Sequence, residues 1–142
     1  MNALSATVES IESDDFFSFV YLRTNDTVLK LFQTELPKWL DVGDEVECKI
    51  QEASVAICKG DHGDADVSIE NHIGATIADY RKGDMLSELT LNAPCGSVRS
   101  LISTEAFERM ALGTGDSVTM LLKAVDIKLQ PKIESVLQKE NG

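Results

Sequence analysis

Basic residues are scarce in this sequence. Its 142 residues include 13 Lys or Arg against 24 Asp or Glu, which leaves a net charge of −11. Proteins that bind nucleic acids gather Lys and Arg to neutralise phosphates, and anionic membrane surfaces attract basic segments. The composition therefore argues against both nucleic acid and membrane surfaces as partners.

Long apolar runs and paired cysteines are also missing. No apolar stretch approaches the roughly 20 residues of a membrane-spanning helix, and residues 1–5 lack the basic segment and apolar run of a secretory signal. The cysteines Cys48, Cys58 and Cys95 form no CxxC pair and are odd in number. We therefore expect a cytoplasmic protein whose thiols are buried and reduced.

Signals for catalysis are few. The two histidines, His62 and His72, belong to no recognisable triad or metal motif. Asp61, Asp64 and Asp66 lie in a polar Gly/Asp stretch that lacks the full calcium-binding loop with its distal Glu. There is no Gly-rich phosphate loop. We therefore expect no catalytic residues, no metal site and no redox cofactor, so that the protein is not an enzyme.

Short strands at regular spacing dominate what is present. Residues 16–22 are rich in aromatic and β-branched types, and the turn dipeptide Asn25-Asp26 separates them from the apolar residues 28–32. This pattern predicts a hairpin. Further short strands are expected at residues 45–50 and 53–58. Four or five such strands are typical of a small barrel or sandwich.

The second half of the chain repeats this plan. At a spacing of 69 residues Asn2 matches Asn71, and at a spacing of 72 the dipeptide Gly43-Asp44 matches Gly115-Asp116. We interpret the pattern as a tandem duplication. The predicted organisation is a first unit at residues 1–60, an acidic Gly/Asp linker at 61–66, a second unit at 67–130 and a C-terminal tail at 131–142.

Each unit is expected to contain one short helix before its Gly-Asp turn. In the first unit it covers residues 34–40, where Pro37 suits only a first turn. In the second unit Ser103 or Thr104 caps it. The tail after Pro131 also shows helical spacing of its apolar residues.

Residues 68–77 resemble the opening of Mop domains, which are small molybdate- and tungstate-binding modules of the molbindin family and similar to TOBE domains. The segments 102–105, 114–118 and 122–127 match later motifs of that family, and 42–46 and 50–55 match them in the first half. The resemblance runs from residue 2 to about residue 130. It implies a mostly β protein with two OB-like five-stranded small barrels, each with a short helix, that self-associates into a homo-oligomer.

The resemblance also implies oxyanion sites at unit or subunit interfaces. Backbone N–H groups, hydroxyls, an amide and a lysine can hold a tetrahedral dianion without a cation. The expected ligand is molybdate or tungstate, two ions of nearly equal size and charge, for intracellular storage, buffering or sensing. The residues that match the family's binding segments are Ser68, Ile69, Asn71, Ser103, Thr104 and Lys123, with Asn2 and Thr34 in the first half.

Two departures affect these expectations. Glu70 stands where the family has an arginine, and Gln51 stands where its closing strand has a lysine, although Lys49 lies nearby. Since most of the excess acidic charge falls in residues 1–66, we expect the anion in the second half.

The residues also permit a structural interpretation. Ser68 and Asn71 can close turns, Ser103 can simply cap its helix, and Lys123 can face solvent. The rival hypothesis is therefore a degenerate tandem module that acts in dimerisation or protein interaction without a ligand.

Overall fold

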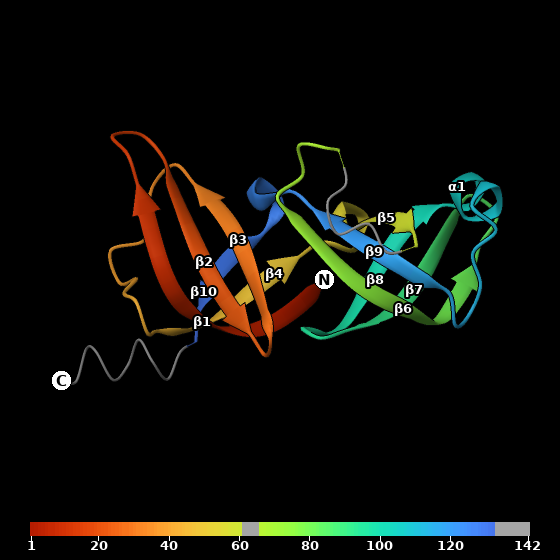
Figure 1. The fold of residues 1–142 in the computed structure, drawn as a ribbon, viewed down its shortest axis with the longest axis horizontal. Coiled ribbons are helices and arrows are strands. Elements are labelled where there is room, and N and C mark those ends of the chain that lie inside the picture. The colour runs from red at the N-terminus through yellow and green to blue at the C-terminus, as the bar shows by residue number, and fades with distance from the viewer. Residues whose placement is uncertain (61–65, 133–142) are drawn as a thin grey trace.

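The computed structural model describes residues 1–60 and 66–132, which form two five-stranded antiparallel sheets side by side (Figure 1). The first sheet contains β1 (Asn2–Ser13), β2 (Ser18–Thr24), β3 (Thr27–Gln33), β4 (Glu45–Ile50) and β10 (Lys128–Pro131), in the order β10-β4-β1-β2-β3. The second contains β5 (Ala56–Lys59), β6 (Asn71–Lys82), β7 (Leu86–Ala93), β8 (Gly96–Ser103) and β9 (Ser117–Leu122), in the order β5-β9-β6-β7-β8. The mostly β class with two five-stranded units is confirmed.

The two sheets exchange their last strands. β5 follows β4 in sequence but pairs with β9 of the second sheet, and β10 follows β9 but pairs with β4 of the first. Short 3-10 turns, η1 (Glu52–Ser54) and η2 (Ala124–Asp126), precede these crossing strands. The sequence ranges 1–60 and 67–130 therefore each contribute their closing strand to the other sheet.

The repeat is visible in the hydrogen bonds of the two Gly-Asp turns. Gly43 has a φ of 93° and donates its N–H to the carbonyl of Val8 at 2.8 Å. Gly115 has a φ of 91° and donates in the same way to Ile77 at 2.8 Å. A left-handed backbone of this kind favours glycine. The matched dipeptides therefore form equivalent turns in the two repeats.

The predicted hairpin across Asn25-Asp26 is confirmed, with Thr24 opposite Thr27 and Asn25 at a positive φ of 54°. Its counterpart joins β7 to β8 through Pro94 and Cys95. The tips of the two hairpins touch, because the Asn25 side-chain amide donates to the Pro94 carbonyl at 3.1 Å. Asn25 and Pro94 are 69 residues apart, which is the spacing of the repeat, so they occupy equivalent positions. A contact between equivalent residues lies close to a pseudo-twofold axis that relates the two repeats.

One helix prediction is right and the other is wrong. α1 (Thr104–Arg109) begins after Ser103, whose hydroxyl accepts a hydrogen bond from the Ala106 N–H at 3.0 Å. Residues 34–40 form no helix. Pro37 lacks an N–H and disfavours helical backbone at the residue before it, so the segment makes only a turn in which Leu40 donates to the Pro37 carbonyl. The helix expected after Pro131 lies outside the described residues.

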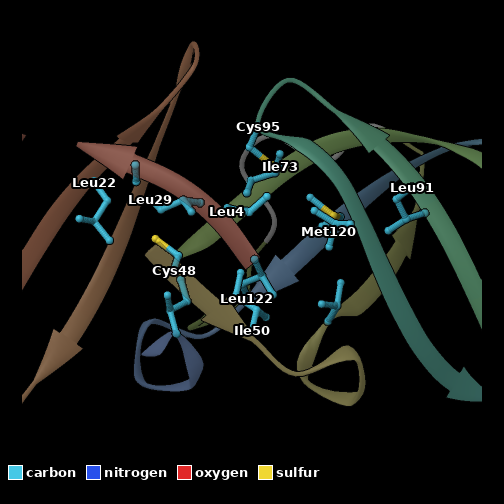
Figure 2. Packing of buried hydrophobic residues seen from close by; sticks show 14 of the residues in the cluster. Leu4, Leu22, Leu29, Cys48, Ile50, Ile73, Leu91, Cys95, Met120 and Leu122 are labelled. Atoms are coloured by element: carbon cyan, nitrogen blue, oxygen red, sulfur yellow. The ribbon is translucent and has the colours of Figure 1, made fainter. Parts of the chain in front are cut away.

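A single hydrophobic core runs through both sheets (Figure 2). Leu22 and Leu29 fill it on the side of the first sheet, and Leu91 and Met120 fill it on the side of the second. Leu4 of β1 lies at the junction, where its side chain comes near Gly96 of β8. Burial of apolar surface therefore joins the repeats as well as stabilising each one.

All three cysteines are free thiols, with Cys48 and Cys95 buried and Cys58 half-buried. Removal from water raises the pKa of the Cys48 thiol to about 12 and also raises that of Cys95. In the described part of the chain no helix has the length and apolar character needed to cross a membrane.

Candidate functional site

Four of the second-repeat residues of the predicted site, Ser68, Ile69, Asn71 and Lys123, belong to segments that come together where the two sheets meet. Ser68 and Ile69 immediately precede β6, and Asn71, the first residue of β6, lies opposite Leu122 at the end of β9. Lys123 follows directly, with an exposed side chain. No carboxylate in residues 1–60 or 66–132 forms an ion pair with Lys123. Lys123 and the backbone that leads into β6 are thus close to each other at one edge.

Glu70 stands in the middle of this group. Its carboxylate accepts a hydrogen bond of 2.6 Å from the backbone N–H of Ala124, the first residue of η2. A backbone N–H at the start of a turn is a donor that an anion could use, and a charge-assisted bond to a carboxylate is stronger than a neutral one. The donor beside Lys123 is therefore already occupied by an anionic side chain of the protein.

The two matched asparagines make structural hydrogen bonds instead of facing an open site. Asn71 is 4% exposed; its side chain accepts from the Lys30 N–H at 2.8 Å and donates to the carbonyls of Lys30 at 2.9 Å and Leu122 at 3.1 Å. Asn2 is 8% exposed and makes the equivalent pair of bonds, both 2.8 Å, with the backbone of Arg99. Each asparagine therefore ties its own strand to an edge strand of the opposite sheet.

Ser103 and Thr104 lie away from this junction, at the outer end of the second sheet where α1 begins (Figure 1). Thr104 is buried, and its hydroxyl donates to the Gly83 carbonyl at 2.7 Å and lies 2.8 Å from the Ser87 hydroxyl. Ser103 is exposed and caps α1. The structure thus does not bring these two residues to Lys123 of the same chain.

Thr34, the first-repeat counterpart of Ser103 at the spacing of 69, is exposed at the end of β3. It lines a cavity of about 290 Å³ together with residues of the other repeat, among them Val125 and Lys128. The end of β3 therefore lies against η2 and the start of β10.

A smaller cavity between the repeats contains residues that sequence reasoning did not select. It has a volume of about 170 Å³ and is lined by Met1, Lys49, Gln51, Ser54, Asp126 and Lys128. In the sequence Lys49 is a near neighbour of Gln51, and no motif includes Lys128. The register of β10 on β4 brings them together, and no local sequence pattern specifies that register.

Across the described ranges 1–60 and 66–132, no cluster of residue types suited to a metal site is present. These residues contain no group of three or more His, Cys, Asp or Glu side chains arranged to hold a metal ion. The ring Nε2 of His72 lies 2.7 Å from the Ile69 carbonyl, next to the β6 strand start. The polar groups at the junction are therefore suited to binding through hydrogen bonds and lysine charge.

Comparisons with known proteins agree with this arrangement. The TOBE domain family matches residues 67–129. The fold is similar to a crystal structure of the cytoplasmic molybdate-binding protein ModG with molybdate bound, with a TM-score of 0.83 and 22% sequence identity over 92% of this chain and 96% of that one. No curated protein matches the sequence. Residues 67–129 thus match the TOBE domain family, and the fold is similar to that of ModG across both repeats.

Proposed function

We propose that this protein binds molybdate or tungstate without catalysing a reaction, as a cytoplasmic store, buffer or sensor of the ion. The observation that carries the proposal is the exposed Lys123, free of any ion pair among the described residues, at the end of β9 next to the backbone that leads into β6. ModG, which has the same fold, is a molybdate-binding protein. A lysine and hydroxyl donors suit a tetrahedral dianion.

The predicted binding residues form two groups that lie far apart within one chain, and this separation supports self-association. Ser103 lies at the outer end of the second sheet, whereas Ser68 and Lys123 lie at the junction (Figure 1). A binding site that contains residues of both groups can form only if α1 of one subunit packs against the sheet junction of another subunit. We therefore propose a homo-oligomer in which Ser68, Ile69 and Lys123 of one subunit face Ser103 and Thr34 of its neighbours.

The two matched asparagines and Thr104 take a supporting role in this proposal. Asn71 holds β6 against β3, and Asn2 holds β1 against β8. Thr104 fixes the first turn of α1 through Gly83. These three residues position the ligand-facing segments through buried bonds.

Calorimetric titration of the full chain with molybdate, tungstate and sulfate tests the proposal, with the oligomeric state measured by light scattering on the same samples. We expect micromolar or tighter binding of molybdate or tungstate, weakened at least about tenfold by Lys123→Ala, because a hydrogen bond to a charged group contributes about 1.5–3 kcal/mol. Lys38→Ala, a change at an exposed lysine in the turn at residues 34–40, is the matched control.

The rival hypothesis makes the opposite prediction. A degenerate module that acts only in dimerisation or protein interaction shows an intact oligomer and no heat with any of the three ions. Binding that Lys123→Ala leaves unchanged would remove Lys123 from the site and leave the function itself in place.

A further inference from the structure

Five aromatic side chains form a continuous strip on the outer face of the first sheet, beginning at its outer end (Figure 1). Val20 and Leu22 of β2 are buried, so the residues between and beside them point to the opposite face. Neighbouring ring centroids along the strip are 5.4 to 6.2 Å apart, within the range of aromatic pairs. The aromatic strip consists of Phe16 and Phe17 in the turn before β2, Phe19 and Tyr21 of β2, and Phe32 of β3.

The fold of the repeat does not require this strip. Phe16 is 74% exposed and Phe17 is 46% exposed. The second repeat builds the same kind of sheet with no aromatic residue at the equivalent positions, which at the spacing of 69 are Met85, Leu86, Glu88, Thr90 and Leu101. Contiguous exposed apolar patches mark interaction sites. We therefore attribute the rings to an interaction and not to the stability of the first sheet.

The two ends of the aromatic strip carry opposite charges. Asp14 and Asp15 lie in the same turn as Phe16. Hydrogen bonds of 2.8 Å from the backbone N–H groups of Phe16 and Phe17 lower the pKa of the Asp14 carboxyl, which keeps it ionised. At the other end, the Nζ of Lys30 lies 4.1 Å from the Phe19 ring centroid. The strip therefore runs from a negative turn to a positive side chain.

These end charges have no counter-charge within the part of the chain that the structure describes. No ion pair in residues 1–60 and 66–132 involves Asp14, Asp15 or Lys30. Lys30 is held over its own rings, with its Nζ also 5.5 Å from the Tyr21 ring centroid. An ammonium group over an aromatic face is attracted to it and can still pair with an outside carboxylate.

A strip with this charge arrangement is complementary to itself. When a second copy lies over it in the opposite direction, the negative end of each strip faces the positive end of the other, and the rings pack between them. A parallel overlay would bring like charges together, and a uniformly acidic or basic partner would match only one end. The contact that satisfies both ends is isologous, with a twofold axis across the middle of the strip.

We propose that two copies of the chain dimerise through the aromatic strip, with Asp15 of each copy facing Lys30 of the other. A buried aromatic side chain covers about 150–250 Å², and several of these rings are already half-buried. The strip is thus smaller than the roughly 800 Å² per partner of a stable complex, so we expect micromolar dimerisation. The contact uses neither α1 nor the Lys123 region and does not rest on the proposed function.

Sedimentation velocity of the ion-free full chain over the micromolar range tests the dimer. We expect the main species to double in mass as the concentration rises. Phe17→Ser should weaken this association at least about tenfold, because central aromatic residues carry much of the energy of an interface and each occurs twice in an isologous contact. Val42→Ser removes a 60% exposed apolar side chain outside the strip and is the matched control, which should associate as the wild type does.

Charge reversal tests the orientation of the two copies. Asp15→Lys alone and Lys30→Glu alone should each weaken the association by about tenfold, since each replaces two attractive contacts with two repulsive ones. Both changes in one chain should restore it, because the two ends are again opposite in sign. Asp84→Lys, the same charge change at the second-repeat counterpart of Asp15, should leave the association unchanged.

Circular dichroism and urea unfolding check that every variant is folded. If Phe17→Ser leaves the mass distribution unchanged, or if the double charge reversal stays as dissociated as the single changes, the aromatic strip does not pair two copies of the chain. Because no oxyanion is present in these measurements, that result would leave the proposed binding of molybdate or tungstate untouched.

Discussion

The Glu70 carboxylate and the Ala124 backbone N–H form a 2.6 Å hydrogen bond at the junction of the two sheets. This bond joins the segment before β6 to the η2 turn after Lys123. It also puts a negative charge beside the lysine on which the proposed oxyanion site depends. Glu70 is therefore expected to oppose binding at that site.

Glu70→Ala should strengthen binding of molybdate or tungstate at Lys123 by roughly fivefold, since removing a negative charge a few ångströms from the anion is worth on the order of 1 kcal/mol near a surface. The same change should speed hydrogen exchange of the Ala124 amide, because its acceptor is lost. Calorimetry and exchange measurements check the two effects. Glu88→Ala, at a residue of β7 that contacts Arg81, is the control. Unchanged affinity with faster exchange would show that Glu70 has no electrostatic effect on the site.

Asn71→Ala should lower the free energy of unfolding by about 2–4 kcal/mol, because it removes three hydrogen bonds and leaves the Lys30 N–H and the Leu122 carbonyl without this partner. Urea unfolding followed by circular dichroism measures the change. Asn92→Ala, at an exposed position of β7, should change stability by less than about 0.5 kcal/mol. An Asn71→Ala protein of wild-type stability would contradict the structural role and favour a ligand role.

The exchanged strands predict that the repeats do not fold independently. A chain of residues 1–60 lacks β10, and a chain of residues 67–142 lacks β5, so each has one sheet with a missing strand. We expect neither piece alone to unfold cooperatively, because half-length chains bury too little surface to be more than marginal. An equimolar mixture should recover the transition. A monomeric single piece with a sharp thermal transition would show that the exchange is not required for folding.

Thiol labelling tests the burial of the cysteines. In the native protein an alkylating reagent at pH 8 should modify Cys58, while Cys48, with a pKa raised to about 12, stays protonated and shielded. Mass spectrometry identifies the labelled residue, and all three should react in denaturant. Rapid native labelling of Cys48 would contradict its burial.

The Cys48 pKa also sets a pH dependence of stability. The folded-state pKa is above the ordinary value of 9.0, so the unfolded thiol loses its proton first as the pH rises. The free energy of unfolding is therefore expected to fall from about pH 9 up to about pH 12. Below pH 9 this thiol is protonated in both states, so it causes no change of stability with pH. Cys48→Ala should remove this part of the dependence in urea unfolding at pH 7 and pH 10.

Much of the local structure could be predicted because the signals were local. Asn25-Asp26 specifies a tight turn, Gly115-Asp116 specifies a left-handed turn, and Ser103 specifies a helix start. The helix predicted at residues 34–40 is absent for an equally local reason, because Pro37 disfavours helical backbone at Leu36. The resemblance to Mop domains extended these signals to the whole fold.

The strand exchange and the cavity of about 170 Å³ between the repeats could not be predicted in the same way. β4 and β5 are close in sequence, and the pattern of apolar residues does not specify which strand each one pairs with. The pairing of Lys49 with Lys128 depends on that choice. Likewise, an asparagine at the start of a strand can bind a ligand or can hydrogen-bond to an edge strand. For Asn71 the structural role follows from the position of the Lys30 backbone, which the sequence does not specify.

The strand exchange also bears on how the chain is made. Ribosomes synthesise the N-terminal repeat first, at about 5–20 residues per second, so β1 to β4 can pair before β10 exists. The outer edge of β4 then has no partner until residues 128–131 emerge, on the order of ten seconds later. An unpaired edge is a template for pairing with other chains. Nascent copies on one messenger RNA therefore carry complementary open edges, and the order of synthesis favours exchange between neighbouring chains as the characteristic misfolding route.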